Sequence, residues 1–187
     1  MEPDNYLTYE QFGRKFFETA VSEERVCNAI AAIAGDAFEI GPMGQGPAKI
    51  AKVTAKVRIM DPRVTRTLGE EITFDIRIPL EIDMVVDLRI DKPKFMVFGE
   101  ITLSATARAA EPLLLILDVE KPRPSDISIH VTSKSLRAEV VRVLGNIDAE
   151  VRRFIAAHVS GEIESPASQK AKVIDVATSI DAAWTGV

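Results

Sequence analysis

The chain has 187 residues, of which 47% are hydrophobic and 27% charged, so it can bury a core and is predicted to form a single globular domain over 1–187. Its formal net charge of −5 argues against nucleic-acid binding, because displacing counterions from phosphates needs a basic surface. Its single cysteine, Cys27, excludes an internal disulfide and a cysteine zinc cluster. We expect no cofactor and no metal.

The N-terminal residues, Met1 to Asn5, carry two acids and lack the basic and apolar regions of a signal peptide. No run of residues reaches the ~18 apolar positions of a membrane span. The sequence therefore favours a soluble cytoplasmic protein without a transmembrane segment.

Two helices are predicted before the first strand. Thr8 and Gln11 have the spacing of a capping box, and apolar residues at helical spacing follow them. Ser22 precedes two glutamates and a second amphipathic pattern that ends at Gly35. The glycine- and proline-rich segment 41–47 is typical of a loop.

The longest pattern runs from Ile72 to Ile90. Every even position in it is apolar, whereas the odd positions are polar except for Pro79 and Val85. A period of two predicts a β-strand with one apolar face, far longer than the usual ~5–6 residues. Pro79 predicts a bend or an edge position, because proline cannot donate to the ladder.

Further strands follow the same logic. Alternating segments over 49–59, 95–107 and 127–131 predict one-sided strands, and Gly99 predicts a bulge in the second of them. Leu113 to Val119 is apolar on both faces, which predicts a central strand or one covered on both sides.

The period then changes to that of a helix. Apolar residues from Leu136 to Val159 recur every 3.6 residues and predict a long amphipathic helix that ends at Gly161. Ser165 followed by proline predicts the start of a last helix, although Lys172 to Ala177 is also suited to a short strand, because Val173 to Val176 is β-prone. The tail over 170–184 stays open between the two.

These elements predict an α+β fold: a long, strongly curved antiparallel sheet wraps around the long C-terminal helix, with helices at the N-terminus. We divide it into a helical extension (1–21), a body (22–160) and a tail (161–187). The segment 22–59, the alternation 72–90 and the helix 136–159 resemble a single module of the tubular lipid-binding (TULIP-like) superfamily. The resemblance covers most of the chain after Ser22 and implies an apolar tunnel for acyl chains, without catalytic residues. A helix-grip fold is the alternative architecture.

Candidate catalytic residues are few. His130 and His158 have no second ligand at metal-binding spacing, and both are predicted to be surface residues. The acids of the long strand share its polar face with Arg77 and Arg89, which predicts ion pairs across strands. We therefore expect a protein that is not an enzyme.

The leading hypothesis is binding or carriage of a lipid or another hydrophobic small molecule in the tunnel. The predicted apolar lining consists of Phe74, Ile76, Ile78, Ile82, Met84, Leu115, Phe154 and Ile155. The alternative is a structural or adaptor module that forms a homodimer or binds a partner protein through residues such as Phe12, Phe16 and Phe17. Arg152 and Arg153 leave transient contact with an anionic membrane surface open.

Overall fold

The computed structural model describes residues 6–45, 51–88, 91–131 and 138–184, which form the predicted α+β fold. The helices are α1 (Tyr9–Ala20), α2 (Glu23–Ala34), α3 (Ala138–Glu164), α4 (Pro166–Ala171) and α5 (Val176–Trp184), with a 3-10 turn η3 (Pro124–Asp126). The strands are β1 (Ala37–Gln45), β2 (Ala51–Ile59), β3 (Arg63–Leu68), β4 (Ile72–Asp87), β5 (Lys94–Ala110), β6 (Leu114–Val119), β7 (Ile127–Val131) and β8 (Val173–Asp175).

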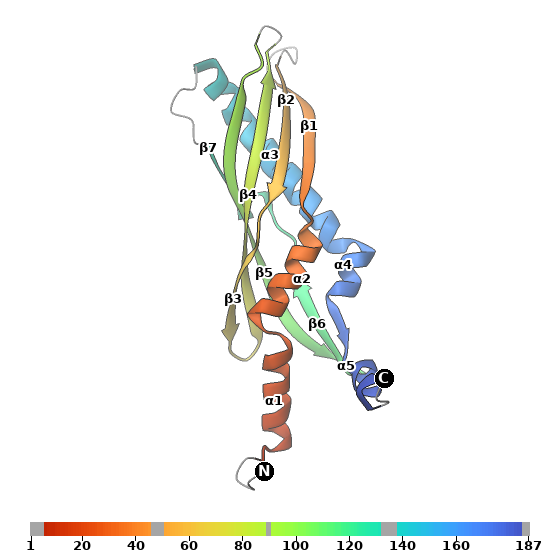
Figure 1. The fold of residues 1–187 in the computed structure, drawn as a ribbon. Coiled ribbons are helices and arrows are strands. Elements are labelled where there is room, and N and C mark those ends of the chain that lie inside the picture. Colours follow the sequence, from red (N-terminus) through yellow and green to blue (C-terminus); the bar gives the residue numbers. More distant parts are fainter. Residues whose placement is uncertain (1–5, 46–50, 89–90, 132–137, 185–187) are drawn as a thin grey trace.

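The eight strands described belong to one strongly curled antiparallel sheet. Six of them follow the order β1-β2-β4-β5-β6-β8, and β3 and β7 pair in addition with β4 and β5. β2 and β3 pair with opposite halves of β4, and β7 and β6 pair with opposite halves of β5. Figure 1 shows an elongated molecule in which β4 and β5 run along the long axis and α1 projects from one end. The sheet therefore consists of two halves that share their two central strands.

Pro79 does not interrupt β4, which pairs with β5 on both sides of it. The Pro79 carbonyl accepts a hydrogen bond of 2.9 Å from the backbone N–H of Met60, in the segment between β2 and β3. Because the N–H and C=O of one residue in an antiparallel strand face the same neighbour, the missing N–H of Pro79 also faces that segment. Pro79 thus faces the break between β2 and β3, where its missing N–H leaves the fewest ladder hydrogen bonds unmade.

Both N-terminal helices begin where predicted. The Thr8 hydroxyl accepts from the backbone N–H of Gln11 at 3.2 Å, and the Gln11 side chain accepts from the backbone N–H of Thr8 at 3.0 Å. The Ser22 hydroxyl accepts from the backbone N–H of Arg25 at 3.4 Å, and α2 ends at Gly35 with φ of 72°.

The predicted loop over 41–47 is wrong for its described part, because β1 continues to Gln45. The pairing of β1 with β2 shifts register between Ile40 and Met43, so a bulge takes up Gly41 and Pro42. A Cβ on Gly41 would lie 2.5 Å from the Val53 carbonyl oxygen, and its φ is 103°. Glycine here allows a close strand contact rather than ending the strand.

The predicted bulge at Gly99 is also wrong. Gly99 pairs with Leu80 on one side and Ile129 on the other, in registers that run without a shift. A Cβ on Gly99 would lie 2.8 Å from the carbonyl oxygen of Ser128. The glycine therefore permits the close approach of β7.

The C-terminal part departs from the prediction at one point and contains both predicted alternatives. α3 passes through Gly161 and ends at Glu164, because Ile163 is still buried and its packing outweighs the ~1 kcal/mol cost of a helical glycine. Ser165 caps α4 as expected. The tail then forms a short strand, β8, followed by a helix, α5.

The core lies on the concave side of the sheet, where the even-numbered residues of β4 are buried along its whole length. Helix α2 contributes Val26, Ile30 and Ile33 to it. The part of α3 from Ile147 onward contributes an apolar stripe. Two helices, not one, thus supply side chains to this face (Figure 1).

Candidate functional site

Seven of the eight predicted tunnel residues are buried. The side chains of Ile76, Ile82 and Ile155 are 0% exposed. The other four buried residues are at most 6% exposed: Phe74, Ile78, Met84 and Leu115. A side chain without accessible surface borders no space that a water molecule can enter. The interior around Ile76, Ile82 and Ile155 is therefore filled by neighbouring side chains.

Phe154 is the exception. Its side chain is 49% exposed, whereas the next residue on α3, Ile155, is fully buried. The helical period separates neighbours by about 100°, so adjacent residues cannot both face the sheet. The structure thus places neither Phe154 nor Leu115 in the core cluster that contains the other six residues.

The strand predicted to be central or covered on both faces is central, since β6 lies between β5 and β8, but only one of its faces is buried. Leu115, Leu117 and Val119 of β6 are buried, whereas Leu114 and Ile116 are half-buried. β8 pairs with the edge of β6 within the same sheet, so it does not cover the face that carries Leu114 and Ile116. Apolar surface remains accessible at this end of the molecule.

The charged residues on the outer face of the sheet form ion pairs across strands, as predicted for Arg77, whereas Arg89 lies outside the described residues. Arg58 contacts Glu81 at 2.8 Å and Asp83 at 3.3 Å, and Arg77 lies 3.6 Å from Glu100. Within the described ranges no group of three or more His, Cys, Asp or Glu residues could hold a metal ion.

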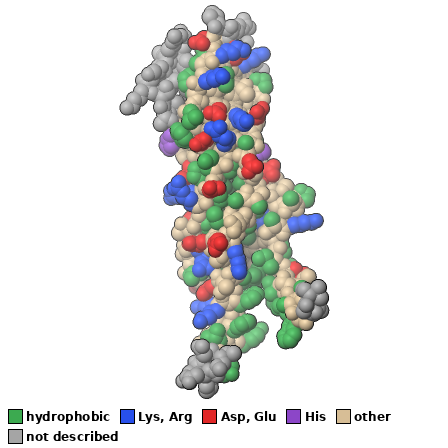
Figure 2. All heavy atoms as spheres, viewed as in Figure 1, with side chains coloured by type: hydrophobic (Ala, Val, Ile, Leu, Met, Phe, Trp, Pro, Cys, Tyr) green, Lys and Arg blue, Asp and Glu red, His purple; other side chains and the backbone are tan. Residues whose placement is uncertain are grey.

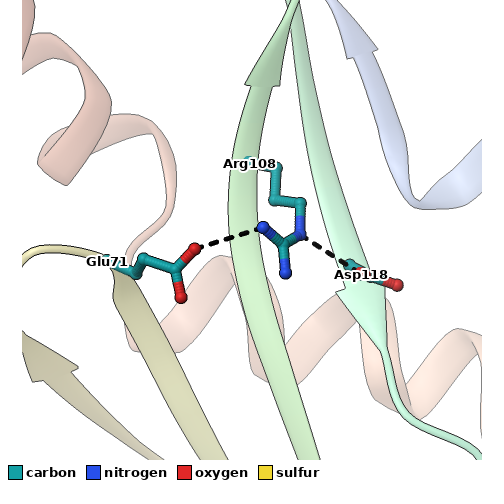
Figure 3. A network of polar contacts seen from close by, with 3 residues as sticks. All are labelled: Glu71, Arg108 and Asp118. Carbon is teal, nitrogen blue, oxygen red and sulfur yellow. Dashed lines mark hydrogen bonds and ion pairs between the residues drawn. The ribbon is translucent and has the colours of Figure 1, made fainter.

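A further network, which the sequence analysis missed, joins Glu71, Arg108 and Asp118 (Figure 3). The Arg108 guanidinium lies 3.1 Å from Glu71 and 3.2 Å from Asp118. All three side chains are more than half exposed, so the network stabilises the fold by at most ~1 kcal/mol per pair. The strand register brings these residues together, which residue spacing alone could not reveal.

The two histidines lie in different surroundings. His130 is exposed on β7, as predicted. His158 is half-buried and its ring stacks on Phe38 of β1, with ring centroids 3.8 Å apart. The contact docks α3 against β1 at the edge of the sheet.

Exposed apolar side chains gather where α1 and α5 project from the same end of the molecule (Figure 1). We call this surface the apolar end and define it as Tyr9, Phe12, Phe16, Ile174, Ile180 and Trp184. Figure 2 shows hydrophobic side chains on both sides of the gap between the two helices. No residue of α1 is buried, although Phe12 and Phe16 stack on each other with centroids 6.2 Å apart. The amphipathic helix α1 thus presents an apolar face that the described part of the chain leaves uncovered.

An apolar slot of about 60 Å³ lies between the α1–α2 junction and strands β6 and β8. Val21 and Val26 line one wall, and Leu115, Leu117 and Ile174 line the other. The sequence predicts Phe12 and Phe16 as partner-binding residues and Leu115 as part of the tunnel lining. It does not point to Ile174, Ile180 and Trp184 at this surface, because only the pairing of β8 with β6 brings the tail to this end.

Asp175 fixes the start of α5. One of its carboxylate oxygens accepts from the backbone N–H of Thr178 at 3.0 Å, and the other accepts from the Thr178 hydroxyl at 2.9 Å. These hydrogen bonds lower the pKa of Asp175, with the backbone bond as the larger cause. The cap holds α5, and with it Trp184, next to β8.

Over the described residues, no helix has both the length and the apolar character needed to cross a bilayer. No protein-family model matches the chain, and no curated protein matches it.

Proposed function

We propose that the protein is a non-enzymatic structural or adaptor module that associates with another protein chain through its apolar end. The observation that carries this proposal is the exposure of Tyr9 at 92%, Phe12 at 60% and Trp184 at 86% on two elements that flank one gap. Large exposed aromatic side chains in a contiguous patch are typical of protein interfaces.

The amount of apolar surface supports the proposal. At ~200 Å² for each aromatic side chain, the exposed parts of Tyr9, Phe12, Phe16 and Trp184 together offer about 550 Å². The largest apolar patch on a typical monomer is about 300–600 Å² and is often functional. Ile174 and Ile180 enlarge this patch further.

Site-specific photo-crosslinking tests the proposal. The photoreactive residue p-benzoylphenylalanine replaces Phe12 in one variant and Met96 in a control, because Met96 is 50% exposed on β5 and lies outside the apolar end. We expect a protein adduct in expressing cells from position 12 and none from position 96. No protein adduct from position 12, or equal adducts from both positions, would contradict the proposal. Mass spectrometry of the adduct separates a second copy, another protein and a lipid.

A second candidate is carriage of a hydrophobic small molecule, as the resemblance to tubular lipid-binding modules implies. In that proposal the sheet wraps around the whole length of α3 and an acyl chain lies between them. The closed packing at Ile76, Ile82 and Ile155 requires α3 to move before such a chain can enter. The apolar slot at Leu115 favours entry from the same end of the molecule.

A fluorescent fatty acid tests this second candidate. Saturable binding that weakens when Leu115→Trp fills the slot supports carriage, and Met96→Trp is the control for an added tryptophan. Absence of saturable binding to the wild-type protein removes the candidate.

A further inference from the structure

We propose that the partner at the apolar end is a second copy of this chain, bound through an antiparallel pairing of the two α1 helices across a two-fold axis between residues 12 and 13. This inference rests on the proposed function and names its partner. Each α1 lies in the gap between α1 and α5 of the other copy.

The face of α1 has the pattern that such a pairing needs. Tyr9, Phe12, Gly13, Phe16 and Ala20 fall on one side of the helix at 3.6 residues per turn. Around the proposed axis, Tyr9 lies opposite Phe16 of the second copy. A two-fold axis brings each flank of the face next to the same flank of the second copy, so Phe12 lies next to Phe12 and Gly13 next to Gly13. Each of the three aromatic rings therefore meets an aromatic ring of the second copy.

Gly13 marks the point of closest approach. It lies in the middle of α1, where glycine costs about 1 kcal/mol relative to alanine. A Cβ at this position would have no atom within 4 Å, so no contact inside the described chain requires glycine. A glycine at a helix crossing lets the axes approach to the ~8 Å lower limit of helix packing.

The charges of α1 are complementary in the same arrangement. Glu10 and Arg14 lie on one flank of the apolar face, and antiparallel pairing about a two-fold axis brings Glu10 next to Arg14 of the second copy. Neither side chain has an ion-pair partner in the part of the chain that the structure describes. The helix carries two acids and two bases, so its surface is neutral although each chain carries −5.

A second copy fits better than an unrelated protein because α1 supplies both halves of every contact between the two α1 helices. An isologous interface uses each complementary pair twice. The four aromatic side chains offer about 550 Å² per copy at ~200 Å² each, and the two isoleucines bring the patch toward the ~800 Å² that each partner of a stable complex buries.

Sedimentation velocity over a range of concentrations tests the pairing. We expect a reversible dimer, and Gly13→Leu should dissociate it because its side chain fills the crossing point. Glu10→Arg or Arg14→Glu alone should weaken dimerisation about tenfold or more, since each places like charges together. The double variant Glu10→Arg/Arg14→Glu should restore the wild-type affinity to within about threefold, because the pair is re-formed with exchanged charges.

Lys15→Glu is the matched control, since it changes the charge of α1 as Arg14→Glu does but lies on the other flank. Lys15→Glu should leave the dimer intact. A cooperative thermal unfolding transition of Gly13→Leu should show that this variant still folds as a monomer. A monomeric wild-type protein overturns the inference, as does a dimer that is insensitive to Gly13→Leu and the charge exchange. A crosslink from position 12 to a different protein would overturn the inference while leaving the proposed function in place.

Discussion

Substituting Ile155 tests whether the space between the sheet and α3 is a solid core. Ile155 is 0% exposed and belongs to the core cluster, and Ile155→Ala removes three carbon atoms from it. At ~0.8 kcal/mol per buried carbon the transfer term is about 2.4 kcal/mol, and the cavity left behind brings the total to about 3–4 kcal/mol. For a chain of this length that corresponds to a fall in Tm of about 6–16 °C.

Urea denaturation of the purified protein measures this loss, with Phe154→Ala as the control. Phe154 is the neighbouring residue on α3 and is 49% exposed, so its removal should cost at most about 1 kcal/mol. A small loss for Ile155→Ala, equal to that for Phe154→Ala, would refute the conclusion that the core is closed at this position. Such a result would fit a lined cavity that already contains space.

Three further outcomes are expected. Gly99→Ala should lower the free energy of unfolding by about 1–3 kcal/mol in urea denaturation, because its Cβ would lie 2.8 Å from the Ser128 carbonyl oxygen; no loss would contradict the close contact. The hydrogen bonds to Thr178 lower the pKa of Asp175, so its cap on α5 is complete above pH 3.8, the ordinary pKa of the group. The cap is lost as the pH falls through the lowered pKa of the folded protein. The fluorescence of the single tryptophan should change in that range, and in Asp175→Ala it should already differ at neutral pH. Arg108→Gln should change stability by less than about 1 kcal/mol, and by still less in high salt, so a larger loss in thermal unfolding would mean that its two ion pairs act as a buried network.

The elements with a long period or a strong cap could be predicted from the sequence. The alternation from Ile72 predicted β4 because one buried face forces apolar residues to every second position. Thr8 and Ser22 marked helix starts because a hydroxyl that satisfies a free backbone N–H is a local signal.

The errors arose where long-range packing decides the structure. Glycine and proline at 41 and 42 read as a loop, but a bulge opposite β2 absorbs them. Gly161 read as a helix end, although Ile163 still packs into the core two residues later. In each case a contact with a distant element outweighs the local preference, and spacing along the chain carries no information about that contact.

The candidate site was predictable only in part for the same reason. Phe12 and Phe16 stand out because they form the apolar stripe of a short helix. Trp184 and Ile174 belong to the same surface only because β8 pairs with β6. Of the predicted lining, Phe154 lies away from the core, because the helical period turns its side chain toward the surface.

Native mass spectrometry of the purified protein tests the central claim most directly, because it weighs the assembly and anything bound inside it. If a second copy covers the apolar end and the core is closed, the protein should have twice the 20.5 kDa mass of the chain and no extra mass from a bound lipid. A single chain that carries the extra mass of a lipid would contradict the account.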